Sequence, residues 1–523
     1  MIGTNIVITT NNWILNGIMA VIMLMIITVV VAYLFMTRKF NYWKKRGVYE
    51  VKPVAFFGNM TNCILGKRSP SFIFKDLYDK TKGLPHMGLY IFDKPCLLLR
   101  DREIVKDVLI RDFDYFCDRT MMCSPTDRLG RSTLPLLKEP TWKIVRGKLT
   151  RVFTSHKLKK MFDFMMECSV DLDSYLDSLG LDGKGKIVDV KDLFINLTTD
   201  IISNTAFGVK INSFRNPNNE FRIKGKKTTD FTLKRGLELI MVFFYPEITR
   251  LFNIKLFGAG CNRFFRKFFW DMVEQRTQSG KKRGDLVDIL IKLKEEFADQ
   301  DFNDFKFDGD DLVAQAAIFI SGSLETSSTT MSFALYEIAI HPEVQNKLRK
   351  EILDAVREAG GKITYEMVTI SLPYLDMVLS ETMRMYPVVS VLDREVVKSY
   401  KIPNSDLVIE KGMSVYISLL GMHYDPEYFP NPEEFDPERF SPDNIHKIPS
   451  CAYMPFGEGP RKCIGIRFGF LQMKLGIIKT LYRYEVTPCE KTTIPMKLNP
   501  KSPIISTMTG EVCLNIRKLD IEV

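Results

Sequence analysis

One of the ten cysteines, Cys463, lies in a loop that could make its sulfur reactive. The stretch 454–469, "MPFGEGPRKCIGIRFG", is rich in glycine and places Arg461 and Lys462 directly before the cysteine. Apolar residues recur every three or four positions over 466–481, which predicts a helix beginning just after it. The positive end of that helix and the two basic side chains favour a thiolate over a thiol. Because glycine lacks a Cβ, the loop can approach a flat or bulky group closely.

Three kinds of chemistry could use such a thiolate. A catalytic nucleophile needs a partner base, and none of the five histidines lies in a recognisable nucleophile motif. A zinc site needs further ligands, which the neighbouring sequence does not supply. The third possibility is an axial ligand of haem iron, where a thiolate pushes electron density onto the metal and favours O–O cleavage.

The cysteine loop resembles the haem loop of the cytochromes P450, which has the pattern F-x-x-G-x-R-x-C-x-G. The resemblance implies a fold that is mainly α with a minor β part. It also implies that Cys463 is the axial thiolate ligand of a haem b iron, and that Phe456 and Gly457 contact the haem. The residues that match the pattern are Phe456, Gly459, Arg461, Cys463 and Gly465.

Two further segments match sequence patterns of the same family. "TWKIVRGKLTRVF" (141–153) resembles its W-x-x-x-R helix, and "VVSVLDREVV" (388–397) contains an arginine at a further matching position. Arginine suits an anionic partner because its guanidinium offers a forked set of donors. The residues expected by resemblance to hold the haem propionates are Trp142, Arg146, Arg394 and Arg461.

An E-x-x-R pair, Glu381 and Arg384, precedes the cysteine loop. On its own such a pair is usually a surface ion pair that contributes little stability. "DPERF" follows at 436–440 and contains Arg439. By resemblance, the three residues form a buried network that holds the scaffold on the haem side. Loss of one partner would leave a buried charge unpaired.

The segment 310–342 reads as one long helix, with acidic residues at its start and His341-Pro342 at its end. A polar island interrupts its apolar middle at 321–328. By resemblance this island is the oxygen-binding segment, and Glu325 with Thr326 is an acid–alcohol pair suited to proton delivery to bound dioxygen. Ser323 stands where the family usually has a second glycine, so it is expected to narrow the oxygen pocket or to add a hydroxyl to the relay.

The N-terminal stretch 13–36 carries no charged residue and, as a helix, spans roughly 35 Å, enough to cross a bilayer. A basic cluster over 38–46 follows it, which places the rest of the chain in the cytosol. We therefore expect a membrane anchor over 1–37, a basic stop-transfer segment and hinge over 38–60, and a haem-thiolate monooxygenase domain over 61–523. By resemblance, the membrane is that of the endoplasmic reticulum.

The segment 237–257 allows two interpretations. It is either a core helix that ends at Pro246, or a second surface on which Phe243 and Phe244 dip into the membrane. The net charge of +10 fits an anionic membrane surface or an acidic protein partner. Nucleic acid is not an expected partner, because the sequence has no basic-aromatic RNA motif and no zinc-finger spacing.

The resemblance covers the whole chain, and stretches such as "HYDPEYFPNPEEFDPERF" (423–440) look most like insect microsomal cytochromes P450 that metabolise xenobiotics. It implies a monooxygenase that inserts one atom of O2 into apolar organic substrates, either xenobiotics such as plant toxins and insecticides or endogenous lipids and hormones. Its expected partners are NADPH-cytochrome P450 reductase, cytochrome b5 and membrane lipid. Substrate contacts are expected from 119–137, 237–257, 317–326, 388–392 and 504–508.

Two alternatives remain open. A haem-thiolate isomerase or dehydratase that rearranges peroxides needs neither a reductase nor a proton relay, so Glu325 and Thr326 argue against it. A membrane protein that only sequesters haem or another ligand would consume no NADPH in the presence of a reductase.

Overall fold

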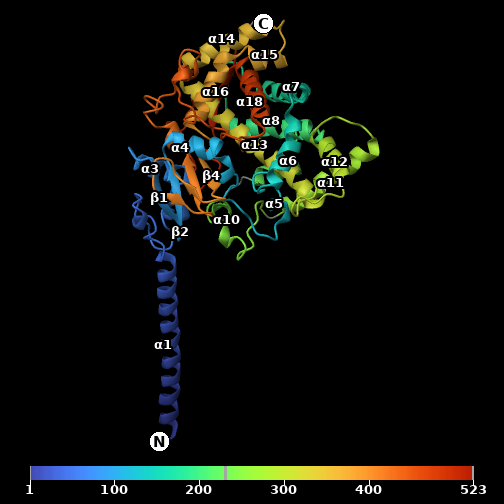
Figure 1. The fold of residues 1–523 in the computed structure, drawn as a ribbon. Coiled ribbons are helices and arrows are strands. Elements are labelled where there is room, and N and C mark those ends of the chain that lie inside the picture. The colour runs from blue at the N-terminus through green and yellow to red at the C-terminus, as the bar shows by residue number, and fades with distance from the viewer. Residues whose placement is uncertain (1, 229–231, 259, 521–523) are drawn as a thin grey trace.

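The structure is a computed structural model that describes residues 2–228, 232–258 and 260–520, with side chains from residue 15 onward. Helix α1 (Ile2–Thr37) extends straight out of the body (Figure 1). Its stretch Leu15–Thr37 contains an 18-residue window with a mean hydropathy of 2.9, and no residue of that window is buried in the body. Among the described residues it is the one helix long and apolar enough to cross a membrane, as the sequence predicts.

The segment that follows α1 is packed against the first sheet. Trp43 is fully buried, and its Nε1 donates to the Leu89 carbonyl at 3.2 Å. The indole occupies the space beside Gly88, where an added Cβ would lie 2.2 Å from the ring. Arg38 forms an ion pair with Asp93 at 3.3 Å. The segment predicted to be a hinge is therefore held to the body at several points.

Helices make up most of the body, and α13 crosses its centre in contact with α8, α11, α16 and α18 (Figure 1). The longer helices are α7 (Ser155–Ser178), α8 (Val190–Phe207), α10 (Leu233–Phe244), α11 (Cys261–Ser279), α12 (Leu286–Glu296), α13 (Gly309–Ile340), α14 (Pro342–Glu358), α16 (Pro373–Met385) and α18 (Ile466–Leu481). The shorter helices are α2 (Thr61–Ile64), α3 (Pro70–Asp79), α4 (Arg102–Lys106), α5 (Arg128–Arg131), α6 (Thr141–Leu149), α9 (Glu220–Lys227), α15 (Tyr365–Ile370) and α17 (Leu419–His423). The long helix predicted over 310–342 is confirmed as α13.

The β part is small, as predicted. A four-stranded sheet has the order β1-β2-β7-β4, in which β2 and β7 run parallel and the other neighbours antiparallel. A three-stranded sheet has the order β3-β9-β8, and β5 pairs with β6. The strands are β1 (His86–Ile91), β2 (Lys94–Leu99), β3 (Lys186–Asp189), β4 (Val391–Glu395), β5 (Tyr400–Lys401), β6 (Val408–Ile409), β7 (Ser414–Ser418), β8 (Tyr484–Thr487) and β9 (Cys513–Lys518).

The structure corrects the second interpretation of 237–257. Helix α10 ends at Phe244, whose ring is buried and packs on Phe74 at a centroid distance of 5.7 Å. Phe243 is half-buried against the same core. Leu251 and Phe252, in the turns after α10, are 80% and 69% exposed. The exposed apolar surface therefore lies at this later pair, because tertiary contacts cover the first.

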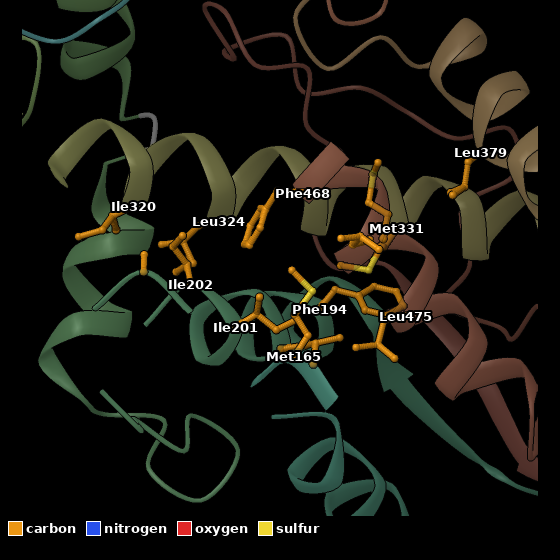
Figure 2. Close-up of a cluster of buried hydrophobic side chains, with 14 of the residues drawn as sticks. Met165, Phe194, Ile201, Ile202, Ile320, Leu324, Met331, Leu379, Phe468 and Leu475 are labelled. Carbon is orange, nitrogen blue, oxygen red and sulfur yellow. The ribbon is translucent and has the colours of Figure 1, made fainter. Parts of the chain in front are cut away.

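A core of apolar side chains fixes α13 and α18 relative to α7 and α8 (Figure 2). Met165 and Phe194 lie in this cluster with Met331 and Leu475. The two central helices approach closely at Gly476 of α18, where an added Cβ would lie 2.4 Å from the sulfur of Met331. Side-chain packing thus sets the separation of the two helices that flank the predicted site.

Candidate active site

A cavity of about 390 Å³ lies beside α13 and α18. Its walls combine segments that are far apart in the sequence, because α6, α13, the residues before β4 and the cysteine loop all contribute to it. Of the predicted site residues, Glu325 and Arg394 are outside its lining. The predicted site residues that line the cavity are Trp142, Arg146, Thr326, Phe456, Gly457, Arg461 and Cys463.

The cysteine loop, residues 454–465, is shaped by glycine and by one backbone hydrogen bond. The Cys463 N–H donates to the Phe456 carbonyl at 2.9 Å, and α18 begins three residues later. Gly459 has φ +74°, and an added Cβ there would lie 1.8 Å from the Leu109 carbonyl oxygen. Only glycine fits that position. The loop leaves Cys463 exposed, with its side chain on the cavity wall.

Opposing influences act on the Cys463 thiol. Surrounding protein raises its pKa, while the Gly465 N–H and the charges of Arg146 and Arg119 lower it. Arg146 is held in place because its Nη2 donates to the Lys462 carbonyl at 2.7 Å. An iron ligand must be a thiolate, so a bound metal cation would have to supply the remaining stabilisation.

The sequence assigned the supporting positive charge to Arg461 and Lys462, and the structure corrects this. Lys462 Nζ pairs with Glu458 at 3.1 Å. Arg461 Nε donates to the Cys117 carbonyl at 2.5 Å, and its guanidinium lies 4.1 Å from the ring centroid of Trp142. The charges that lower the pKa of the sulfur therefore come from Arg146 and Arg119, and not from Arg461 or Lys462.

Three arginines gather beside the cavity without enough partners. Within the described chain, Arg119 Nε, Arg394 Nε and Arg461 Nη1 are buried and have no hydrogen-bond partner. Burial, and next the charge of Arg119, lower the pKa of Arg394 to about 9 and that of Arg461 to about 10. The nearby acids are Asp393, 3.9 Å from Arg119, and Asp118, 3.2 Å from Arg461.

This shortage of partners is what an anionic ligand would relieve. A buried cation without a partner is costly, and carboxylates accept well from guanidinium forks. The two propionates of a haem would bring negative charge to this point, so the donor set fits that group. Sequence reasoning missed Arg119 as a member, because "CDRTMM" (117–122) carries no local pattern and its partners come from β4 and the cysteine loop.

The structure places Thr326 and Glu325 on different sides of α13. The Thr326 hydroxyl donates to the Gly322 carbonyl at 2.6 Å, and the residue lines the cavity. Glu325 is buried and forms an ion pair with Lys191 of α8 at 2.8 Å. Consecutive helical residues point about 100° apart, which separates the pair. Sequence reasoning had no signal for Lys191, which is distant in the chain.

The expected substrate segments are only partly at the cavity. Residues 237–257 and 504–508 are outside its lining, and some of them border two small cavities of about 20 and 10 Å³. Apolar residues of the other expected segments do line the main cavity. They are Leu134, Pro135, Ile318, Phe319, Val388, Val389 and Leu392.

The predicted Glu381–Arg384–Arg439 network is confirmed. Glu381 and Arg384 are both fully buried and share two contacts, at 2.7 and 2.8 Å, and Arg439 Nε lies 3.3 Å from Glu381. Arg384 also donates to the His423 carbonyl at 2.8 Å. The His423 ring donates from Nδ1 to the Arg384 carbonyl and accepts from the Met454 N–H at Nε2. The network therefore reaches the start of the cysteine loop.

The two other roles considered for Cys463, a catalytic nucleophile and a zinc ligand, need partner residues at the cavity. No histidine is among the described residues that line the cavity. Nor does the described part of the chain hold a cluster of three or more His, Cys, Asp and Glu side chains placed to bind a metal ion. A cysteine, an apolar wall and a cationic corner on one cavity are features that a flat, amphiphilic, metal-containing cofactor would use.

The chain is similar to known proteins over most of its length. Residues 50–514 match the family model "Cytochrome P450". The chain is 41% identical to cytochrome P450 6k1 of Blattella germanica, over 92% of this chain and 94% of the relative. It is 39% identical to the probable cytochrome P450 6g2 of Drosophila melanogaster, over 93% and 96%. The chain belongs to the cytochrome P450 family of haem monooxygenases.

Proposed function

We propose that this protein is an NADPH-dependent monooxygenase that inserts one oxygen atom from O2 into apolar organic substrates. The observation that carries the proposal is that Cys463, Arg119 and Arg461 line one cavity, and that the guanidinium groups of these arginines and of Arg394 have buried nitrogens without hydrogen-bond partners. When bound there, haem supplies the activation of dioxygen.

Each predicted residue has a role in this proposal. Cys463 would supply the thiolate ligand of the haem iron, and Phe456 and Gly457 would contact the haem beside it. Trp142, Arg146, Arg394 and Arg461, joined by Arg119, hold the propionates. The residues that would hold the cofactor are thus drawn from α6, β4, the cysteine loop and the 113–120 segment.

Thr326 and Glu325 are proposed to handle protons. The Thr326 hydroxyl lines the cavity and can pass a proton to a reacting group there. Glu325 is the nearest carboxylate in sequence, and it must release Lys191 before it can turn toward Thr326. Proton supply through Glu325 is therefore coupled to the opening of a buried ion pair.

The proposed substrates are apolar, because the lining beyond the cationic corner is mainly aliphatic and aromatic. Xenobiotics such as plant toxins and insecticides, or endogenous lipids and hormones, fit this description. Electrons are proposed to come from NADPH through a separate reductase, with cytochrome b5 as a further donor. A ligand panel scored by the low- to high-spin shift of the haem would rank the substrate classes.

The proposed location is the endoplasmic reticulum membrane, with the body on the cytosolic side. Support comes from the apolar helix Leu15–Thr37 and the basic residues that follow it. Leu251 and Phe252 offer a second lipid contact, since α10 lies at the end of the body from which α1 emerges (Figure 1).

This second contact can be tested in the full-length protein. A polarity-sensitive fluorophore on a Phe252→Cys variant should shift to the blue in lipid vesicles, because an apolar residue in this position would enter the bilayer interface. The matched control is Ile370→Cys, since Ile370 is 77% exposed on α15, at the far end of the body (Figure 1). Equal spectra at the two sites would rule out the contact.

The central test of the proposed function is Cys463→Ala. The variant should lose the long-wavelength Soret band that thiolate ligation gives the reduced carbon monoxide complex. Cys451→Ala is the matched control, because Cys451 is a buried free thiol just before the same loop. If the band survives in Cys463→Ala, Cys463 is not the ligand and the proposed function loses its basis.

A further inference from the structure

A polar contact that the proposed reaction does not use joins α13 to α18 at the cavity wall. Gln472 of α18 is 1% exposed, and its Nε2 donates to the Ser327 hydroxyl. Its carboxamide also meets the Ser323 hydroxyl, which lies 3.4 Å from Nε2 and 3.5 Å from Oε1. All three residues line the same cavity as Thr326 and Cys463.

The two serines differ from the other hydroxyl residues around them. Thr326, Ser328 and Thr330 each donate to the carbonyl four residues earlier, so their hydroxyl hydrogens belong to the helix. Ser323 and Ser327 turn to Gln472 instead. Their hydroxyls are therefore oriented by α18 and not by their own helix.

The burial of Gln472 makes its hydrogen bonds to the two serines important for stability. A carboxamide taken out of water costs free energy unless both its ends are hydrogen-bonded. The side chains beside Gln472 in the wall, Phe468 and Met473, are apolar and cannot serve it. Its Oε1 is within reach of one described hydroxyl, that of Ser323, which stands where the family usually has glycine. The unusual serine is thus paired with the glutamine opposite.

We propose that Gln472 and Ser323 act as a positioning pair for the proton-handling face of α13. The pair fixes a polar strip, Ser323–Gln472–Ser327, that lies beside Thr326 on the cavity wall. The carboxylate of Glu325 is held on the other side of α13 by Lys191. A strip of hydroxyl and amide groups can hold water next to Thr326 and so supply protons from within the cavity. This inference rests on the proposed function and adds residues to its proton supply.

The experiment compares Gln472→Leu, Ser323→Gly and the double variant in the full-length holoenzyme with a reductase. Removal of one neutral hydrogen-bonding group should raise peroxide release per NADPH by about three-fold. The double variant should be no worse than Gln472→Leu alone, because both changes remove the same interaction. The infrared C–O stretch of the reduced carbon monoxide complex should move in all three variants, since it reports hydrogen-bond donors in the cavity.

Thr480→Val is the matched control, because Thr480 is a buried hydroxyl on the same helix, bonded to the Gly476 carbonyl at 2.9 Å and outside the cavity lining. It should leave both readings unchanged. If Gln472→Leu fails to fold, Ser323→Gly alone decides, since it only removes a side chain. Unchanged coupling and an unchanged C–O stretch in a folded variant with an intact thiolate band would overturn this inference and leave the proposed function standing. Absence of the thiolate band in the wild-type protein would overturn both this inference and the proposed function.

Discussion

Two groups of arginines lie near the cysteine loop, one around Arg384 and one around Arg394, and they differ in how their charges are satisfied. Arg384 has two contacts with Glu381 and donates to two backbone carbonyls, at His423 and Glu434. Arg394 donates to its neighbouring carbonyl at Asp393, and its Nε has no partner among the described residues.

The difference separates scaffold from site. A buried ion pair with complete hydrogen bonding is self-sufficient and holds chain segments in register. A buried cation that lacks partners is a cost that a folded protein keeps only where another charge will arrive. We therefore propose that the Arg384 group belongs to the frame behind the loop, and that the Arg119–Arg394–Arg461 group would receive an anionic ligand.

The largest expected effect comes from disrupting the Glu381–Arg384–Arg439 network, the complete group, in which the charges are paired. Glu381→Ala removes the carboxylate that Arg384 and Arg439 share, and leaves the fully buried Arg384 and the partly buried Arg439 without a counter-charge. Chemical denaturation should show a loss of about 3–5 kcal/mol in the free energy of unfolding. Glu366→Ala, which removes an exposed ion pair with Lys159, is the control and should show no measurable loss. Similar midpoints for the two variants would mean that the Glu381 group does not support the fold.

An intermediate effect, on haem retention, is expected in the Arg119–Arg394–Arg461 group, the incomplete group, whose hydrogen bonds are not all made. Arg394→Met removes a cation without removing a satisfied pair, so the haem-free protein should keep its stability or gain some. The holoprotein should lose haem to apomyoglobin about ten-fold faster, the size of one charged hydrogen bond. Both rates and midpoints can be measured on the same preparations.

The control for Arg394 is another buried arginine, away from the cavity. Arg349 of α14 is fully engaged, with the Leu481 and Tyr484 carbonyls and Gln345 as acceptors. Arg349→Met should reduce stability and leave haem loss unchanged. If Arg394→Met behaves like Arg349→Met in both measurements, the distinction between scaffold and ligand site fails.

The complete group could be predicted from the sequence, and the incomplete one only in part. Glu381 and Arg384 are three residues apart on a helix, and Arg439 lies in a matching motif, so local patterns name all three. Arg119 has no such pattern. It joins the site through residues of β4 and the cysteine loop, and only tertiary structure brings these together.

The same limit explains the other surprises in this molecule. Lys191 and Gln472 act through partners on another helix, and helical periodicity gives the face of a residue but not its neighbour. Apolar character left Phe243 and Phe244 open to two interpretations, a core helix or a membrane contact, and the ring of Phe74 packs on Phe244. Exposure of Leu251 and Phe252 follows from the turn after α10, whose course depends on the packing below it.

The last test asks whether the Glu381–Arg384–Arg439 network depends on pH through His423. Burial, and next the charge of Arg384, lower the pKa of His423 from 6.5 to about 3. Between these values the unfolded chain binds a proton that the folded protein does not. The contribution to stability is therefore complete above pH 6.5 and is lost as pH falls toward 3, by up to about 1.4 kcal/mol per pH unit.

His423→Gln removes this titration, so its free energy of unfolding should fall less steeply than that of the wild type between pH 6.5 and 4.5. The comparison uses slopes, because the substitution also alters the bonds to Arg384 and Met454 and lowers stability at every pH. Parallel slopes would show that His423 is not kept neutral by its surroundings. A shallower slope in the variant would show that the network behind the cysteine loop is most stable when the imidazole of His423 is neutral. The arginines at the cavity stay charged through this pH range, so they would contribute nothing to the difference in slope.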